Sequence, residues 1–206
     1  MGKFKPQPSF FGACFLVAIM CLVVTPASES QLMTIDPALV EAKEYAKAED
    51  VESIVVLAAS NPDLAVEISQ IAVEINPGMA IDIACRLADV IPNLAIDVAV
   101  SIVEKMPENA MDIASCIAGA LPPENAPSVA AAIANAIPHD YAADIAGAVA
   151  GAVPDWAGET TIRVVEVAPE YEENIKERVA DAIAFEEEVT EDRVPPPAPP
   201  APPYGQ

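Results

Sequence analysis

Acidic side chains recur along much of the chain at a spacing of about 15 residues. They stand at equivalent places of a repeated segment: Glu52, Glu67, Asp82, Asp97, Asp112, Asp144 and Glu159. Clustered carboxylates can bind Ca²⁺ or a basic partner. However, these positions fall opposite the apolar positions of a helix, which favours a solvated face. Neighbouring helix axes are also about 8–10 Å apart, too far for two such side chains to share an ion easily. We therefore predict an acidic surface without a metal site.

Residues for catalysis are scarce. His139 is the single histidine, followed by Asp140 in a predicted turn, so multi-histidine metal sites are excluded. A nucleophile, a base and an oxyanion site cannot be assembled around this pair. The sequence contains no Gly-rich phosphate loop, Cys-x-x-Cys or HExxH motif. The sequence predicts a protein that is not an enzyme and uses no cofactor.

Cys85 and Cys116 are the candidates for a disulfide bond, because an exported protein can hold one. They lie two repeats apart, on helices that are expected to be parallel neighbours. Their positions within the repeat differ by one, which turns the side chains by about 100° and works against the short Cα separation of a disulfide. A disulfide and a pair of free buried thiols remain as alternatives.

Three aromatic residues are candidate contacts for a partner. Tyr141, Trp156 and Tyr171 occupy the third place of consecutive repeats. Aromatic side chains in such a column can anchor a peptide or a sugar. The same place is apolar in earlier repeats, as at Leu64 and Met79, so packing between helices is the favoured interpretation.

Small residues form the other candidate surface. Places that are polar in other repeats hold Gly119, Gly147 and Gly151, and no Lys or Arg occurs between Lys105 and Arg163. Small residues let another backbone approach closely, as in a docking or self-association surface. Glycine in a helix costs about 1 kcal/mol relative to alanine, which asks for a reason. Sequence variation within a repeat array toward alanine and other small residues, without a functional cause, explains the pattern equally well.

These residues belong to a repeat that proline punctuates every 15 or 16 residues. The common pattern of a unit is a Pro, an Ala three residues later, an acid near the sixth place, and then Ile or Val and Ala at helical spacing. Such self-similarity indicates a repeat architecture. The prolines that begin the units are Pro62, Pro77, Pro92, Pro107, Pro122 or Pro123, Pro138, Pro154 and Pro169, and a unit without proline covers residues 47–61.

Each unit is predicted to form one short amphipathic helix. Proline suits the first helical position, and Asn61 and Asn76, just before Pro62 and Pro77, are predicted N-caps. Unit positions 6 and 13 fall on the polar side of the helical wheel. Positions 4, 7, 8, 11 and 15 form the predicted apolar face, which in the unit beginning at Pro77 holds Ala80, Ile83, Ala84, Leu87 and Ile91.

Chain length between the helices restricts how they pack. A helix of about 12 residues is about 18 Å long, and the roughly three remaining residues span at most about 10 Å. Consecutive helices must therefore run antiparallel. We predict an all-α protein, an α-solenoid of about eight to nine short antiparallel helices built from a 15-residue repeat. A compact helical bundle is the alternative.

Both ends of the chain differ from the repeat. Lys3 and Lys5 precede an apolar run over residues 10–24, which small residues up to Ala27 follow. This order is typical of a secretory signal peptide, and the run is shorter than the roughly 20 residues of a membrane anchor. The predicted parts are a signal peptide (1–27), an N-terminal capping helix and linker (28–46), the helical repeat domain (47–185), and an acidic, Pro-rich disordered tail (186–206).

Composition narrows the classes of function. Ten Lys and Arg against thirty-two Asp and Glu give a net charge of −22, which argues against nucleic-acid binding. A mean hydropathy of +0.33 is too apolar for disorder from end to end. We predict a secreted or periplasmic scaffold or protein-binding module with an acidic surface, a protein partner that is basic, and no membrane span after signal cleavage. The alternative is a membrane-active or self-assembling structural protein of the cell envelope.

Overall fold

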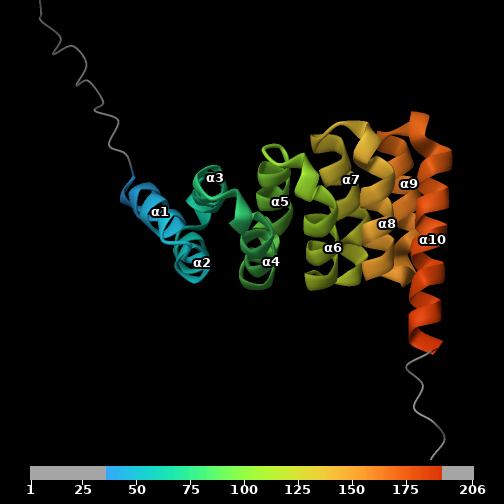
Figure 1. Cartoon of the computed structure of the whole chain (residues 1–206), viewed down its shortest axis with the longest axis horizontal. Helices are drawn as coiled ribbons and strands as arrows, with labels where there is room; N and C mark the ends of the chain where they lie inside the picture. Colours follow the sequence, from blue (N-terminus) through green and yellow to red (C-terminus); the bar gives the residue numbers. More distant parts are fainter. Residues whose placement is uncertain (1–35, 192–206) are drawn as a thin grey trace, which may run out of the picture. The chain divides into compact units, whose positions relative to one another are not determined.

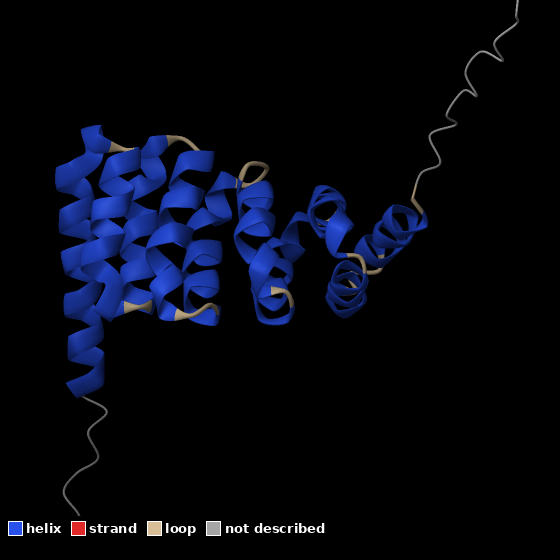
Figure 2. Ribbon diagram, turned by 180° about the vertical axis from the view of Figure 1, so that it is seen from behind, coloured by secondary structure: helices blue, strands red, loops and turns tan. Residues whose placement is uncertain are grey.

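The computed structural model describes residues 36–191, with side chains up to residue 185. The predicted signal peptide and the Pro-rich segment after residue 191 lie outside the described residues. The described part consists of α-helices and short 3₁₀ turns, without strands (Figures 1 and 2). Its helices are α1 (Pro37–Lys47), α2 (Val51–Ser60), α3 (Ala65–Ile75), α4 (Ala80–Val90), α5 (Ala95–Val103), α6 (Ala110–Ala120), α7 (Ala126–Ala136), α8 (Ala142–Ala152), α9 (Ala157–Val167) and α10 (Glu172–Glu191).

A 3₁₀ turn opens each repeat from α3 onward, and the α-helix follows at the fourth residue. The unit at Pro77 is typical: Pro77–Met79 forms the turn, and the amide of Met79 donates to the carbonyl of Asn76 at 3.2 Å. Proline fits here because the first residue of a helical segment needs no amide donor. The turns are η1 (Pro62–Leu64), η2 (Pro77–Met79), η3 (Pro92–Leu94), η4 (Pro107–Asn109), η5 (Pro123–Asn125), η6 (His139–Tyr141), η7 (Pro154–Trp156) and η8 (Pro169–Tyr171).

The predicted asparagine caps are wrong in their chemistry. Neither Asn61 nor Asn76 makes a side-chain capping bond to the turn that follows it. Asn61 instead donates a hydrogen bond from Nδ2 to the carbonyl oxygen of Leu57 at 2.9 Å, and so gives a partner to a carbonyl group in the last turn of α2. The structure thus uses Asn61 to close the preceding helix, where carbonyl groups lack intrahelical partners.

Two repeats are one residue longer because an extra proline precedes the turn. Pro122 and Pro138 have extended backbones, with ψ of 135° in both, and the turns begin at Pro123 and His139. The unit assigned to begin at Pro138 therefore begins at His139. Unit positions are numbered below from the first residue of the 3₁₀ turn, so that Ala80 is position 4. The unit of α2 has no such turn and is numbered from Lys47.

The buried positions agree with the predicted apolar face, with one exception. Positions 4, 7, 8 and 11 of the unit at Pro77 are fully buried. Position 15, Ile91, is only half-buried, whereas position 12, Ala88, is buried. Ile91 has left the helical conformation (φ −131°, ψ 64°) to reach the next proline, so its side chain lies at the edge of the core.

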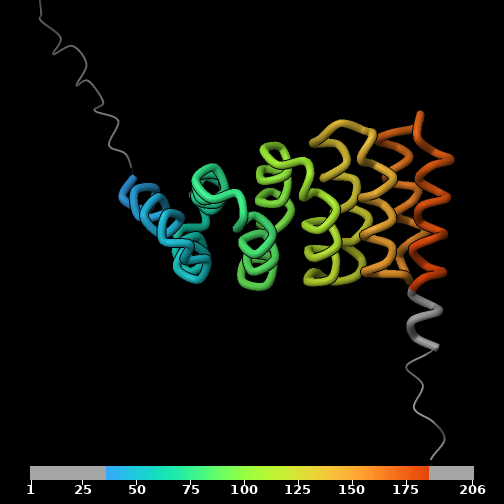
Figure 3. Tube along the Cα trace, viewed as in Figure 1, coloured from blue at the N-terminus to red at the C-terminus, as the bar shows by residue number. Residues whose placement is uncertain are grey.

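The helices form two layers, with odd-numbered helices in one and even-numbered helices in the other. Each helix packs against its neighbour in the chain and against the helix two places along, its parallel neighbour in the same layer. Consecutive helices run in opposite directions, so their connections alternate between the two edges (Figure 3). The α-solenoid prediction is confirmed, with nine repeat helices after the leading helix α1 in residues 36–191. We call α2, α4, α6, α8 and α10 the even layer.

The two end helices extend past the predicted boundaries between parts of the chain, at residues 46 and 185. The leading helix α1 begins at Pro37, where the Asp36 side chain accepts a hydrogen bond from the amide of Ala38, and it ends at Lys47. The last helix, α10, continues to Glu191, beyond the predicted domain boundary at residue 185. Within residues 36–191, no single helix is long and apolar enough to cross a membrane, although the bent pair α2 with η1–α3 passes that test by length and composition.

Candidate partner-binding surface

Alternation of the layers divides the acidic residues into two faces. Because successive helices belong to opposite layers, these side chains do not form one continuous ladder. In the described part of the chain, no group of three or more His, Cys, Asp or Glu residues is placed to hold a metal ion. The even layer carries Glu52, Asp82, Asp112 and Asp144, and the odd layer carries Glu67, Asp97 and Glu159.

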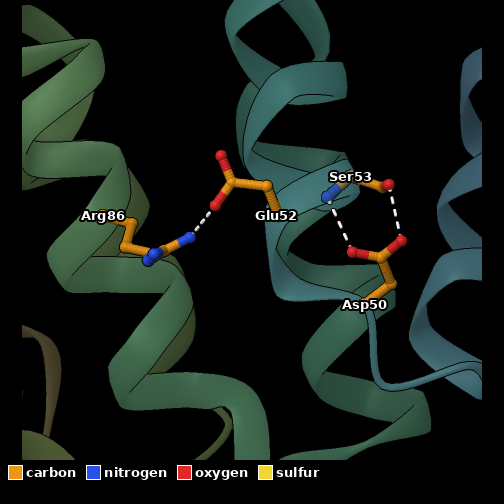
Figure 4. Close-up of polar contacts among 4 residues, drawn as sticks. All are labelled: Asp50, Glu52, Ser53 and Arg86. Carbon is orange, nitrogen blue, oxygen red and sulfur yellow. Dashed lines mark hydrogen bonds and ion pairs between the residues drawn. The ribbon is translucent and has the colours of Figure 1, made fainter.

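Two of the even-layer carboxylates pair with arginines of the next even helix. Glu52 on α2 pairs with Arg86 on α4 (Figure 4). Asp144 on α8 pairs with Arg178 on α10, with Oδ1 and Nη2 2.9 Å apart. Both pairs join position 6 of one helix to position 10 of the next. Both are largely exposed to solvent, so each contributes little stability.

Cys85 on α4 and Cys116 on α6 are joined by a disulfide, with their Cα atoms 5.7 Å apart. The one-position offset, expected to work against this bond, in fact assists it. In parallel neighbouring helices, equal positions point in the same direction and cannot face each other. Position 9 of one helix and position 10 of the next lie on facing flanks. The geometric objection to the disulfide was therefore mistaken.

The three glycines of the predicted small-residue surface have different surroundings. A Cβ atom on Gly147 would lie 2.8 Å from Cγ of Arg178 and 3.2 Å from its carbonyl oxygen, so Gly147 lets α10 approach α8 closely. A Cβ atom on Gly151 would make an ordinary contact with Ala182, also on α10. Gly119 has open space around it. Gly147 and Gly151 therefore serve packing within the chain, and only Gly119 faces outward.

The aromatic residues do not form a single stack. Tyr141 and Tyr171 end the turns before α8 and α10, whereas Trp156 ends the turn before α9 in the odd layer. Because consecutive helices run in opposite directions, Trp156 lies at the other edge of the array. All three side chains are half-buried and pack against the hydrophobic core.

His139 contacts an acidic residue of the same edge. Its Nδ1 lies 3.0 Å from Oε1 of Glu170, in the turn before α10. This hydrogen bond lowers the pKa of Glu170 below its usual value. The contact ties the turn before α8 to the turn before α10.

An acidic hollow of about 450 Å³ lies between α8 and α10. Arg178 is its single basic lining residue among the described side chains, and Arg178 is already paired with Asp144. Four carboxylates and one aromatic residue face the same space. The lining comprises Asp140, Ala143, Asp144, Tyr171, Asn174, Glu177, Arg178 and Asp181.

A more apolar groove of about 270 Å³ adjoins this hollow and shares Asp144, Arg178 and Asp181 with it. Met111 on α6 and Phe185 on α10 were not among the residues singled out from the sequence. Position 5, which Met111 occupies, is apolar in most other units as well, so the repeat pattern contains no signal that singles out Met111. The complete lining is Met111, Asp144, Gly147, Ala148, Arg178, Asp181, Ala182 and Phe185.

Comparisons with protein-family models, with curated proteins and with solved structures found no match to this chain.

Proposed function

We propose that this protein is an exported scaffold that binds basic segments of other proteins on its even layer, without catalysing a reaction. The acidic hollow between α8 and α10 carries the proposal. A solenoid offers an extended surface, and the hollow gives that surface a concave place for a side chain or a short segment. Export rests on the predicted signal peptide.

Charge supports a basic partner. Asp140, Glu177 and Asp181 line the hollow and make no ion pair among the described residues. Carboxylates on low-dielectric walls create a negative potential that attracts cations and speeds their association. The net charge of −22 extends this attraction over the chain as a whole.

The first experiment measures binding of a probe of known charge. We would titrate the chain into a fluorescein-labelled peptide of alternating lysine and glycine, and record its anisotropy at 20 and 150 mM NaCl. A peptide of alternating glutamate and glycine is the control probe. We expect binding of the lysine peptide alone, and weaker binding at the higher salt concentration because salt screens exposed charges.

The location of the binding site on the surface is tested with matched variants. The double variant Asp140→Asn/Glu177→Gln removes two charges from the hollow, whereas Glu67→Gln/Asp97→Asn removes two from the odd layer. We expect several-fold weaker binding of the lysine peptide for the first variant and little change for the second. Equal weakening would show a diffuse charge effect and would contradict a binding site in the hollow. Absence of lysine-peptide binding at 20 mM NaCl would contradict the proposed function itself.

A further inference from the structure

The groove where α6, α8 and α10 meet exposes two large apolar side chains. Met111 is 43% exposed and Phe185 is 64% exposed, and both line the same groove. The small residues Ala148 and Ala182 line the same groove. A concave apolar surface bounded by large flexible or aromatic side chains is typical of the anchor point of a binding site.

Charge around the groove selects what can occupy it. Asp144 and Asp181 line the groove, and Glu177 lies in the adjoining hollow. Arg178, the basic residue of this lining, is paired with Asp144. An occupant must therefore bring cations next to an apolar side chain.

The other candidate occupants lack this chemistry. A second copy of the chain would bring a net charge of −22 against these carboxylates. The chain's own Pro-rich segment, residues 194–206, contains no Lys or Arg. Neither complements the acidic margin of the groove.

We infer that this groove docks a basic amphipathic segment of a partner protein, placing one apolar side chain on Ala148 and Ala182 between Met111 and Phe185. Neighbouring lysine or arginine side chains of that segment contact Asp181 and Glu177. This inference rests on the proposed function and adds the partner's apolar anchor to its positive charge. Binding of such a segment buries Met111 and Phe185, which otherwise remain in water.

Two synthetic peptides test the inference with the unmodified full chain. The first is a labelled 14-residue peptide of lysine and glutamine with leucine at two places four residues apart. The second has serine in place of both leucines and the same charge. We expect the leucine peptide to bind about tenfold more tightly, as the loss of a buried anchor implies.

Variants of the chain locate the contact. Met111→Ser and Phe185→Ser should each weaken binding of the leucine peptide several-fold and leave the serine peptide unaffected. Ile162→Ser is the matched control, because Ile162 is also exposed (56%) but lies on α9 in the odd layer. It should change neither affinity. Circular dichroism and the thermal midpoint establish that each variant is folded.

The results separate the inference from the proposed function. If both peptides bind equally well and the Met111 and Phe185 variants behave as the unmodified chain, the apolar anchor is overturned while a basic partner remains supported. If neither peptide binds at 20 mM NaCl, both proposals fail. If a chain ending at Glu191 binds the leucine peptide more than tenfold better than the full chain, the C-terminal segment occupies the groove and the inference is overturned.

Discussion

The carboxylate of Asp144 on α8 contacts Arg178 on α10 in the same relation in which Glu52 on α2 contacts Arg86 on α4. In both, position 10 of an even helix meets position 6 of the preceding even helix. The disulfide partner Cys116 also stands at position 10 and meets position 9 of its neighbour. Position 10 therefore lies on the flank that faces the preceding helix of the even layer.

This relation predicts an ion pair that can be introduced between α6 and α8. There Ala148 occupies position 10 and Asp112 occupies position 6 of the preceding helix. Ala148→Arg should pair with Asp112 with a coupling energy of about 0.2–1 kcal/mol, the range for exposed pairs. A double-mutant cycle with Asp112→Asn, measured by urea unfolding, determines this energy. Zero coupling at low salt would show that the relation does not extend to this junction.

Glycine substitutions at Gly119 and Gly147 should have opposite effects on stability. A Cβ atom on Gly119 meets nothing within 4 Å, so Gly119→Ala should stabilise the protein by up to about 1 kcal/mol through helix propensity. Gly147→Ala should destabilise it by about 1–3 kcal/mol, because the added atom collides with Arg178 on α10. Gly151→Ala, with an ordinary contact at 3.9 Å, is the intermediate case. Unfolding curves of the three variants measure these changes in the free energy of unfolding. A stabilising Gly147→Ala would contradict the close approach of α10 to α8.

The proline and alanine pattern was sufficient to predict the helices, their alternating direction and the solenoid. These features depend on local rules: proline fixes the start of each unit, and a short connection forces the next helix to return. Contacts between layers and within a layer depend on which flanks face each other. That is why the sequence does not show that the acidic residues divide between two layers, and why the facing arrangement of Cys85 and Cys116 was misjudged. The groove at Met111 and Phe185 forms only when three helices that are distant in sequence meet.

Reduction of the Cys85–Cys116 disulfide should lower stability. The two residues are 31 apart in sequence, and loop closure in the unfolded chain then corresponds to about 3–4 kcal/mol in the chain-entropy model. We expect a lower denaturation midpoint in dithiothreitol, with the loss centred on α4–α6 because repeats unfold semi-independently. The variant Cys85→Ser should have the reduced midpoint and not respond to dithiothreitol. Equal midpoints for the unmodified chain with and without reductant would contradict a stabilising role of the bond.

Replacing Thr160 with valine should make the protein more stable. Its side chain is fully buried, and its Oγ1 has no hydrogen-bond partner among the described residues. Replacing the hydroxyl with a methyl group of similar shape removes the cost of burying it, about 1 kcal/mol or more. Thr161→Val is the matched control, since the Thr161 hydroxyl donates to the carbonyl of Ala157 at 2.8 Å. Thermal unfolding should show a gain for Thr160→Val and no gain for Thr161→Val, and equal effects would contradict this assignment.

Asp50 should make stability depend on pH at the start of α2. Its carboxylate accepts hydrogen bonds from the Ser53 hydroxyl at 2.6 Å and the Ser53 amide at 3.0 Å (Figure 4), and these lower the pKa of Asp50. A pKa that is lower in the folded state than the unfolded value of about 3.9 stabilises the protein above that value. This contribution is lost as the pH falls through the folded pKa. The unmodified chain should therefore exceed Asp50→Asn in thermal midpoint at pH 6, and the difference should shrink toward pH 3.

The matched control for Asp50 is Asp63→Asn, because Asp63 is exposed and accepts no side-chain hydrogen bond among the described residues. At each pH, the change in thermal midpoint caused by Asp63→Asn is subtracted from the change caused by Asp50→Asn. This subtraction removes the general effect of losing one negative charge from an acidic chain. The remaining pH dependence belongs to the cap of α2. If the corrected difference between the unmodified chain and Asp50→Asn stayed constant from pH 6 to pH 3, the ionised form of Asp50 would not be the one that caps the helix. A difference that grew toward pH 3 would have the wrong sign for a carboxylate whose pKa folding lowers.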